Sequence, residues 1–133
     1  MTKASKSKEK KLKKVSDGLG CISIHAGINN TILSVTKSNG EVLAQTSTGA
    51  YFRGAKKTTI YAAQKAAQTI MNKAKEFGID KLLLKVKDIG PGRDAALREI
   101  INNESFRVEQ LIDNTGISFG SQRGVRPRKR PRK

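Results

Sequence analysis

Positive charge is concentrated at the two ends of this chain, and this confines folding to the stretch between them. Of the 133 residues, 1–14 include seven lysines and one glutamate, and 121–133 include seven arginines and lysines and no acid. Segments with so many like charges repel themselves and bury too little apolar surface to fold alone. The middle is nearly balanced, with 13 cations and 10 acids. We therefore expect a disordered basic arm over residues 1–17, one globular domain over 18–117 and a disordered basic extension over 118–133.

The overall charge favours a polyanion as the partner. The formal net charge is +16, and cations placed on phosphates release counterions, so nucleic acid is the natural candidate. A membrane partner is not expected, because neither end has the apolar face of an interfacial helix and no apolar run reaches signal-peptide or transmembrane length. Cys21 is the only cysteine, which excludes an intrachain disulfide and a multi-thiolate metal site. This composition indicates an intracellular protein.

Three short strands are predicted in the first half of the domain, over residues 19–26, 31–36 and 41–46. In the first of these, apolar residues such as Ile22 and Ile24 alternate with polar ones, which is the period of a half-buried strand. Asn39-Gly40, between the second and the third, is typical of a type I′ turn, because both residues tolerate positive φ. The three strands should form an antiparallel meander.

A long amphipathic helix is predicted after the meander. Thr58 or Thr59 can cap its start, and the helix should run to about Phe77, before the stop signal Gly78. Apolar residues recur on one of its faces at spacings of three and four, as expected for a helix that packs on a sheet. This face comprises Ile60, Ala63, Ala67, Ile70, Met71, Ala74 and Phe77.

Two more strands and a second helix complete the domain. A short apolar run predicts a strand over 81–87, and Asp94 can cap a helix over 95–102. The last strand is expected over 106–112, with Phe106, Val108 and Ile112 on one face. The order βββαβαβ predicts an α/β fold with a mixed five-stranded sheet flanked by two helices.

The loop before the long helix is the strongest candidate binding site. Residues 49–59, here called the basic loop, place Arg53, Lys56 and Lys57 close to two glycines and just before a helix start, where free N–H groups favour an anion. No Lys-Ser/Thr pair directly follows the frame from Gly49 to Gly54, as it would in the phosphate loop of a nucleotide hydrolase, so phosphates that belong to a polymer fit better. A solvated basic turn is the alternative interpretation.

Two other loops offer groups for the same kind of ligand. Gly90-Pro91-Gly92-Arg93 adds one cation at a second helix start, although it could be only a connector. Loops at the carboxyl ends of strands collect on one edge of such a sheet, so the two helix starts should share an edge. The C-terminal extension should lie nearby if the last strand is parallel to its neighbours. Asn29-Asn30-Thr31 offers amides and a hydroxyl for sugar or base edges, or simply forms a turn.

Catalytic chemistry is poorly represented, and we expect no catalytic residues, no metal and no cofactor. His25 is the only histidine and is more typical of a packed or hydrogen-bonded residue. Only Asp88 and Asp94 flank one loop and could meet at a metal ion, which keeps a metal-dependent nuclease as an alternative. A histone-like DNA-compacting protein is another. The six aromatic residues form no stacking ladder, and no helix carries enough cations along one face for a reader of the DNA major groove. Structured RNA therefore fits best.

Several motifs, in order and with family spacing, closely resemble the universal small-subunit ribosomal protein eleven family. They are His25-Ala26, Asn29-Asn30-Thr31, the run from Ser47 to Thr59, Ala62-Ala63-Gln64 and Gly90-Pro91-Gly92-Arg93. The resemblance covers about residues 18–127 and points to the bacterial and organellar branch. It implies a ribonuclease-H-like fold without nuclease activity, on the platform of the small ribosomal subunit in the bacterial cytoplasm or an organelle. It further implies binding to small-subunit rRNA near the mRNA exit and the Shine–Dalgarno helix, beside neighbouring ribosomal proteins and without homo-oligomers.

The resemblance also assigns RNA-facing residues. They are Asn29, Asn30, Thr31, Arg53, Gly54, Lys56, Lys57, Thr58, Gly90, Gly92, Arg93, Arg123, Arg126, Arg128, Lys129, Arg130, Arg132 and Lys133. The chain departs from the family pattern in two places. Asp88-Ile89 stands where a second Pro-Gly step is usual, and Ser118 to Pro127 differs from the usual His-Asn-Gly-Cys-Arg-Pro-Pro tail.

Overall fold

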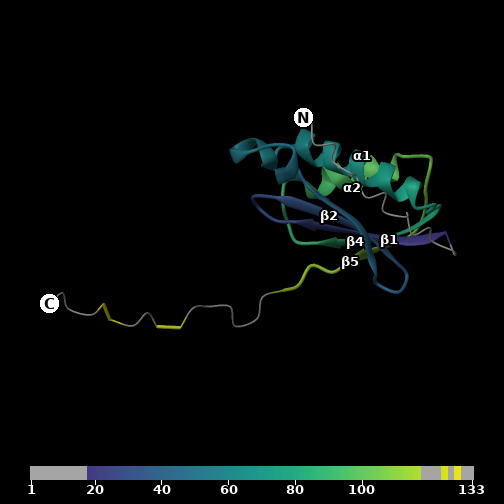
Figure 1. Cartoon of the computed structure of the whole chain (residues 1–133). Helices are drawn as coiled ribbons and strands as arrows, with labels where there is room; N and C mark the ends of the chain where they lie inside the picture. Colours follow the sequence, from purple (N-terminus) through teal and green to yellow (C-terminus); the bar gives the residue numbers. More distant parts are fainter. Residues whose placement is uncertain (1–17, 118–123, 126–127, 130–133) are drawn as a thin grey trace, which may run out of the picture.

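The computed structural model describes residues 18–117, 124–125 and 128–129, and it has two layers, a sheet and a pair of helices that cover one of its faces (Figure 1). Its elements follow the predicted order, with two short 3₁₀ segments inserted after the third strand. The elements are β1 (Leu19–Ala26), β2 (Thr31–Lys37), β3 (Val42–Ser47), η1 (Thr48–Ala50), η2 (Gly54–Thr58), α1 (Ile60–Glu76), β4 (Lys81–Lys87), α2 (Arg93–Ile101) and β5 (Arg107–Asp113). The α/β class and the mixed five-stranded sheet with two helices are therefore confirmed.

The sheet has the strand order β3-β2-β1-β4-β5. β2 is antiparallel to both β1 and β3, whereas β4 is parallel to both β1 and β5. β1, β3, β4 and β5 therefore point the same way, and their carboxyl ends meet at one edge of the sheet, here called the loop edge. This strand order is compatible with the ribonuclease-H-like arrangement that the resemblance implies.

One hydrophobic core lies between the sheet and the two helices. Alternation along β1 places Ile22 and Ile24 in it, and Leu84 of β4 pairs with Ile22 on the same buried face. α1 faces this core mainly with alanines, whose small side chains let its backbone approach the sheet closely. Its buried residues are Ala62, Ala63, Ala66, Ala67, Ile70, Met71 and Ala74.

The limits of α1 agree with the sequence, but its buried stripe differs at the first residue. Thr59 caps the helix, since its Oγ1 accepts a hydrogen bond from the Ala62 N–H at 3.3 Å. Gly78, at a φ of +74°, ends it. The expectation that Ile60 is buried is wrong, because its side chain is 62% exposed. Ile60 occupies the first helical position, ahead of the turns that lie over the sheet.

The hairpin between β2 and β3 is not the type I′ turn that the sequence predicts. Gly40 has a φ of +87°, but Asn39 does not have a positive φ, since Asp88 is the only such non-glycine residue in the described part of the chain. The Gly40 N–H donates to the Lys37 carbonyl at 3.0 Å, and the Lys37 N–H donates to the Glu41 carbonyl at 2.9 Å. These bonds define a three-residue loop that ends in a left-handed glycine.

The start of α2 is also corrected. The helix begins at Arg93 with Gly92 as its cap and no side-chain capping bond. Asp94 is therefore not the cap that the sequence predicts but a residue of the first turn. Its carboxylate still lies at the positive end of the helix dipole, where it is stabilising.

A bulge divides the face predicted for the last strand. The register of β5 against β4 shifts after Val108, so that Ile112 lies opposite Lys85. Val108 packs against the core, whereas Lys85 is exposed on the sheet face that the helices leave open. Phe106, Val108 and Ile112 thus do not share one face, because a bulge reverses the alternation of the residues that follow it.

The charged ends fall largely outside the described residues. This applies to the arm over 1–17 and to Arg123, Arg126, Arg130, Arg132 and Lys133, whereas Arg128 and Lys129 are described and exposed. All helices and strands of the described part lie between Leu19 and Asp113. No helix in that part is long and apolar enough to cross a membrane. The domain limits and the disorder of the two ends stay predictions.

Candidate nucleic-acid interface

Four loops converge at the loop edge, because four strands end there. They are residues 27–30 after β1, 48–59 after β3, 88–92 after β4 and 114–117 after β5. The basic loop and the loop before α2 therefore share one edge, as the sequence predicts. Since β5 is parallel to β4, the chain also leaves the sheet at this edge on its way to the C-terminal extension.

The Asn30 side chain ties the first loop to the start of the basic loop. Its Oδ1 accepts hydrogen bonds from the Thr48 hydroxyl at 2.7 Å and from the Gly49 N–H at 3.0 Å. Thr48 Oγ1 accepts in turn from the Thr31 N–H at 3.1 Å. The carbonyl end of the Asn30 amide is thus used inside the protein, and its NH₂ end has no partner among the described residues.

The loop between β4 and α2 packs closely against the rest of the edge through Thr31 and two glycines. Thr31 is 3% exposed and lies against Gly92, where an added Cβ would collide with the Thr31 hydroxyl. A Cβ at Gly90 would collide with the backbone carbonyl groups of Ala26 and Gly27. Only glycine permits this close approach of two backbones. Thr31, Gly90 and Gly92 therefore shape the edge, and direct RNA contact by these residues stays a prediction.

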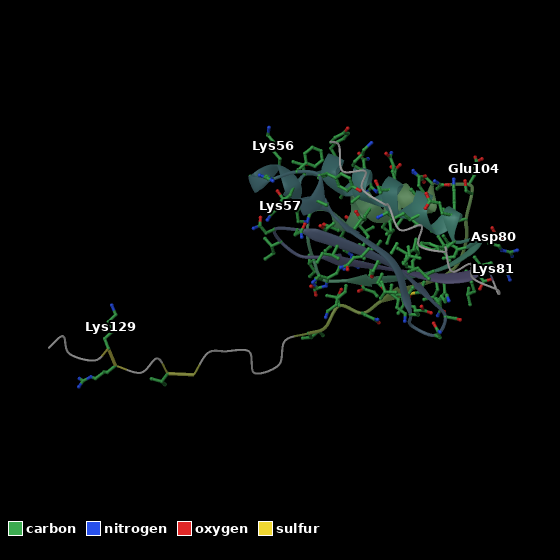
Figure 2. The ribbon with its side chains drawn as sticks, in the orientation of Figure 1. Lys56, Lys57, Asp80, Lys81, Glu104 and Lys129 are labelled. Atoms are coloured by element: carbon green, nitrogen blue, oxygen red, sulfur yellow. The ribbon has the colours of Figure 1, made fainter. Side chains whose placement is uncertain are left out.

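The cations of the basic loop are available for a ligand. Gly54, at a φ of +64°, opens η2, with Arg53 as its cap and Lys56 and Lys57 in its last turn. Arg53 and Lys56 are exposed and Lys57 is partly exposed. None of the three side chains has an ion-pair or hydrogen-bond partner among the described residues. Figure 2 shows Lys56 and Lys57 at the opposite end of the molecule from Asp80.

The end of η2 lies between these cations and the start of α1, and two threonine hydroxyls hold it. Thr58 Oγ1 donates to the Ala55 carbonyl at 2.7 Å, and Thr59 Oγ1 donates to the Lys56 carbonyl at 2.8 Å. Phe52 packs edge-to-face on Tyr61, with the ring centroids 5.9 Å apart. The loop therefore presents its cationic side chains on a braced 3₁₀ turn that precedes the start of α1.

Arg93 is turned toward the residues that lead into the C-terminal extension. Its NH1 group donates to the Asp88 carbonyl at 3.0 Å and to the Thr115 hydroxyl at 3.1 Å, and its NH2 group donates to Asp113 Oδ2 at 2.5 Å. Hydrogen bonds from Thr115 and Arg93 lower the pKa of Asp113 from 3.8 to about 2. Arg93 thus joins α2 to the end of β5, and its predicted contact with RNA stays a prediction.

His25 and Asp88 form a pair at the ends of β1 and β4. His25 Nδ1 lies 3.3 Å from Asp88 Oδ2, in keeping with the hydrogen-bonded role that the sequence favours for this histidine. No group of three His, Cys, Asp or Glu side chains in the described part could hold a metal ion. The described part therefore offers no carboxylate cluster in support of the alternative function, a metal-dependent nuclease that uses Asp88 and Asp94.

The predicted RNA-facing residues differ in exposure. Those exposed are Asn29, Arg53, Gly54, Lys56, Arg128 and Lys129, those partly exposed are Asn30, Lys57, Thr58, Gly90 and Arg93, and those buried are Thr31 and Gly92. Thr48, Asp113 and Thr115 also hold the edge together, although the sequence patterns did not predict this role. An Asp followed two residues later by Thr at a turn is the signal for the last two, since Asp113 Oδ1 accepts from the Thr115 N–H at 2.9 Å.

Comparison with known proteins finds similar sequences over nearly the whole chain. Residues 20–132 match the family described as Ribosomal protein S11. A protein named small ribosomal subunit protein uS11 from Stenotrophomonas maltophilia (strain K279a) is 39% identical, over 97% of this chain and 96% of its own length. The protein of that name from Nautilia profundicola is 41% identical over 99% of both chains. The one from Xanthomonas campestris pv. campestris (strain B100) is 40% identical, over 97% of this chain and 96% of its own.

Proposed function

The chain belongs to the ribosomal protein S11 family, and from this premise we propose that it is a structural constituent of the small ribosomal subunit that binds small-subunit rRNA. Its place is the ribosome, and its partners are rRNA and other ribosomal proteins. Proteins of this family are structural components, so the chain is not an enzyme.

Within the subunit, the proposed position is the platform, where the protein shapes the exit side of the mRNA path near the Shine–Dalgarno helix. A single copy acts there, in contact with mRNA and neighbouring proteins, in the bacterial cytoplasm or in an organelle. About 40% identity with bacterial relatives of nearly equal length supports this finer assignment.

The observation that carries rRNA binding is the set of unpaired cations on the loop edge. Arg53, Lys56 and Lys57 lie on one short turn whose start is held by glycine geometry and whose end is held by threonine hydrogen bonds. Their side chains have no partner in the described part of the chain. A rigid group of free cations is suited to phosphates, because little side-chain and loop ordering is left to be lost on binding.

The remaining predicted residues take different roles in this proposal. Asn29 and the free NH₂ group of Asn30 face sugar or base edges, and Gly90 and Gly92 keep the edge compact enough for an RNA helix to approach. Arg93 directs the chain toward the extension. The cations of that extension neutralise phosphates between RNA helices. They are Arg123, Arg126, Arg128, Lys129, Arg130, Arg132 and Lys133.

Sedimentation of a tagged copy from cell lysate tests the proposal. The lysate is run at low and then at high salt, with Mg²⁺ present throughout. We expect the protein to migrate with the small subunit in both gradients, because contacts buried among RNA are screened less than exposed ones. Loss of the protein at modest salt, or equal affinity for duplex DNA and rRNA, would contradict it and favour a loose polyanion binder.

A further inference from the structure

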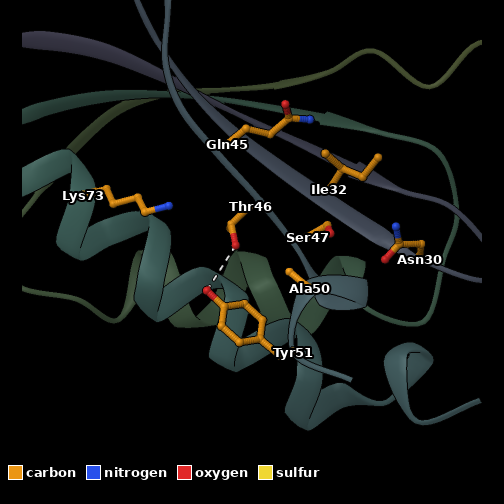
Figure 3. A pocket seen from close by; sticks show the side chains of 8 residues that line it. All are labelled: Asn30, Ile32, Gln45, Thr46, Ser47, Ala50, Tyr51 and Lys73. Carbon is orange, nitrogen blue, oxygen red and sulfur yellow. Dashed lines mark hydrogen bonds between the residues drawn. The ribbon is translucent and has the colours of Figure 1, made fainter. Parts of the chain in front are cut away.

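We propose that a hollow between β3 and α1 binds the phosphodiester backbone of an RNA strand, as a second contact beside the loop edge. The inference rests on the proposed function and adds a site of which only Asn30 is among the RNA-facing residues assigned above. The hollow, here called the β3 hollow, is lined by Asn30, Ile32, Gln45, Thr46, Ser47, Ala50, Tyr51 and Lys73 (Figure 3).

The β3 hollow has the size and position for a segment of a polymer. Its volume is about 450 Å³, and it lies at the outer edge of the sheet, since β3 is an end strand. In Figure 3 the Lys73 side chain reaches from α1 toward Thr46, and Tyr51 stands below them. The Tyr51 hydroxyl is fixed by a hydrogen bond to Thr46 Oγ1 at 3.2 Å.

Most of the lining residues are polar, and three of them lack protein partners in the described part of the chain. The Gln45 amide, the Ser47 hydroxyl and the Lys73 ammonium group form no hydrogen bond or ion pair among the described residues. The NH₂ end of Asn30 is likewise free there. An anion with several acceptor oxygens, such as a phosphodiester flanked by ribose hydroxyls, can use all of these donors.

Positive charge surrounds the Tyr51 hydroxyl. Lys65, Thr69 and Lys73 follow one another at four-residue spacing, which places them on one face of α1. Partial burial raises the pKa of Tyr51, but hydrogen bonds with Thr46 and Thr69 and the charges of Lys73 and Lys65 lower it below its ordinary value. The single acid of α1, Glu76, forms no ion pair with Lys73 in the described part.

RNA fits this surface better than a protein segment does. Asn30 lines the β3 hollow and also braces the loop edge, so the two surfaces are continuous. Arg53 lies two residues after Tyr51, so one strand can pass from the basic loop into the hollow. A protein strand added to β3 would gain from apolar pockets. Here the apolar groups of Ile32, Ala50 and the Tyr51 ring lie among polar side chains, which are those of Asn30, Gln45, Thr46, Ser47 and Lys73.

Photocrosslinking in the assembled small subunit tests the inference. A benzophenone amino acid is placed at position 45 in the hollow, at position 57 in the basic loop, or at position 110. Gln110 is the matched control for Gln45, because both are exposed glutamines on the two end strands of the sheet. We expect rRNA crosslinks from positions 45 and 57, and at least several-fold fewer from position 110.

The outcomes separate this site from the proposed function. Crosslinks to rRNA from position 57, with none or only protein crosslinks from position 45, would overturn the β3 hollow and leave the function standing. Equal yields from positions 45 and 110 would also overturn it. No rRNA crosslink from either position 45 or 57 would overturn both.

A second measurement uses the salt dependence of binding to small-subunit rRNA. The Lys65→Ala/Lys73→Ala variant should lower the slope of log affinity against log salt by up to about two contacts. Tyr51→Phe keeps the ring and should weaken binding several-fold at constant slope. The matched control is Lys75→Ala/Lys81→Ala, which removes the same charge but lies outside the hollow, where Lys75 covers Phe106 and Lys81 pairs with Glu109. Equal slopes for the two double variants would count against the site.

Discussion

At the scale of single residues, Arg93 shows how tertiary contacts change the role of a cationic side chain. A cation at a helix start favours an anionic ligand, and the sequence predicts that role. The fold also supplies protein acceptors, because β5 ends beside α2 and brings Asp113 and Thr115 to the guanidinium group. Arg93 therefore positions the chain that leads into the extension.

This cluster predicts a pH dependence of stability. The pKa of Asp113 is lowered from 3.8 to about 2 in the folded protein, so its contribution is fully present above the unfolded pKa and is lost as the pH falls through the folded one. The difference in free energy of unfolding between the wild type and Asp113→Asn should be constant near neutral pH and vanish near pH 2. Denaturant titrations of both proteins between neutral pH and pH 2 measure this difference. A difference that grows on acidification would contradict the assignment, and Arg93→Gln should reduce the same pH dependence.

Gly90 carries a second prediction at this scale. A Cβ at Gly90 would collide with the carbonyl groups of Ala26 and Gly27, whereas a Cβ at Gly116 would meet nothing within 4 Å. Gly90→Ala should therefore destabilise the protein by about 1–3 kcal/mol, the usual cost of overpacking. Gly116→Ala is the control and should be nearly neutral. Urea unfolding of both variants measures this difference in stability. Equal unfolding midpoints would show that the loop backbone can shift to accommodate a Cβ at Gly90 without cost.

At the scale of elements, the basic loop is a structural unit of its own. The sequence predicts cations directly before a long helix, and the structure places them on η2, with Thr59 capping α1 behind them. A short turn braced at both ends can hold three cations toward one ligand without drawing on the N–H groups of α1. The unit of RNA recognition proposed here is therefore the turn.

Removal of all three cations of this turn gives the corresponding prediction. Arg53→Ala/Lys56→Ala/Lys57→Ala should lower the salt slope of binding to small-subunit rRNA by up to about three contacts. The control is Lys75→Ala/Lys81→Ala/Arg107→Ala, which removes the same charge from residues away from the loop edge and should change the slope less. Filter binding at several salt concentrations provides the slopes. An unchanged slope in the first variant would refute the role of the turn.

At the scale of the whole molecule, strand direction creates the interface. Four of the five strands end at one edge, so loops from distant parts of the sequence form one surface. The charge is distributed differently, because about half of the cations lie in the two ends, over residues 1–14 and 121–133. The helices and strands therefore lie in one part of the described chain, and about half of the cations that can attract RNA lie in the two ends.

Deletion of residues 1–17 and 118–133 should separate these two properties. All helices and strands of the described part lie within the remaining segment, so we expect cooperative unfolding with a midpoint close to that of the full chain. The salt slope of rRNA binding should fall by more than it does in the triple variant of the basic loop, because more cations are removed. Thermal unfolding followed by circular dichroism checks the first expectation. Loss of a cooperative transition would show that the ends contribute to the fold.

Local sequence patterns were sufficient to predict the types and approximate limits of the helices and strands, because periods of two and of three to four residues act between neighbours along the chain. Its composition also showed that about half of the cations lie at the two ends, and its motifs located the basic loop. The prediction erred where local preference was overridden, as at the turn of Asn39, where a three-residue loop replaces the predicted type I′ geometry. The bulge in β5 had no counterpart in the predicted pattern.

Which polar groups remain free for a ligand depends on tertiary contacts. The parallel pairing of β1, β4 and β5 brings Arg93 to Asp113 and Thr31 to Gly92. These contacts join residues far apart in sequence, and their formation depends on strand order and register, which no local period encodes. The cations of the basic loop stay free for the same physical reason, since no strand or helix of the described part brings an acid against them.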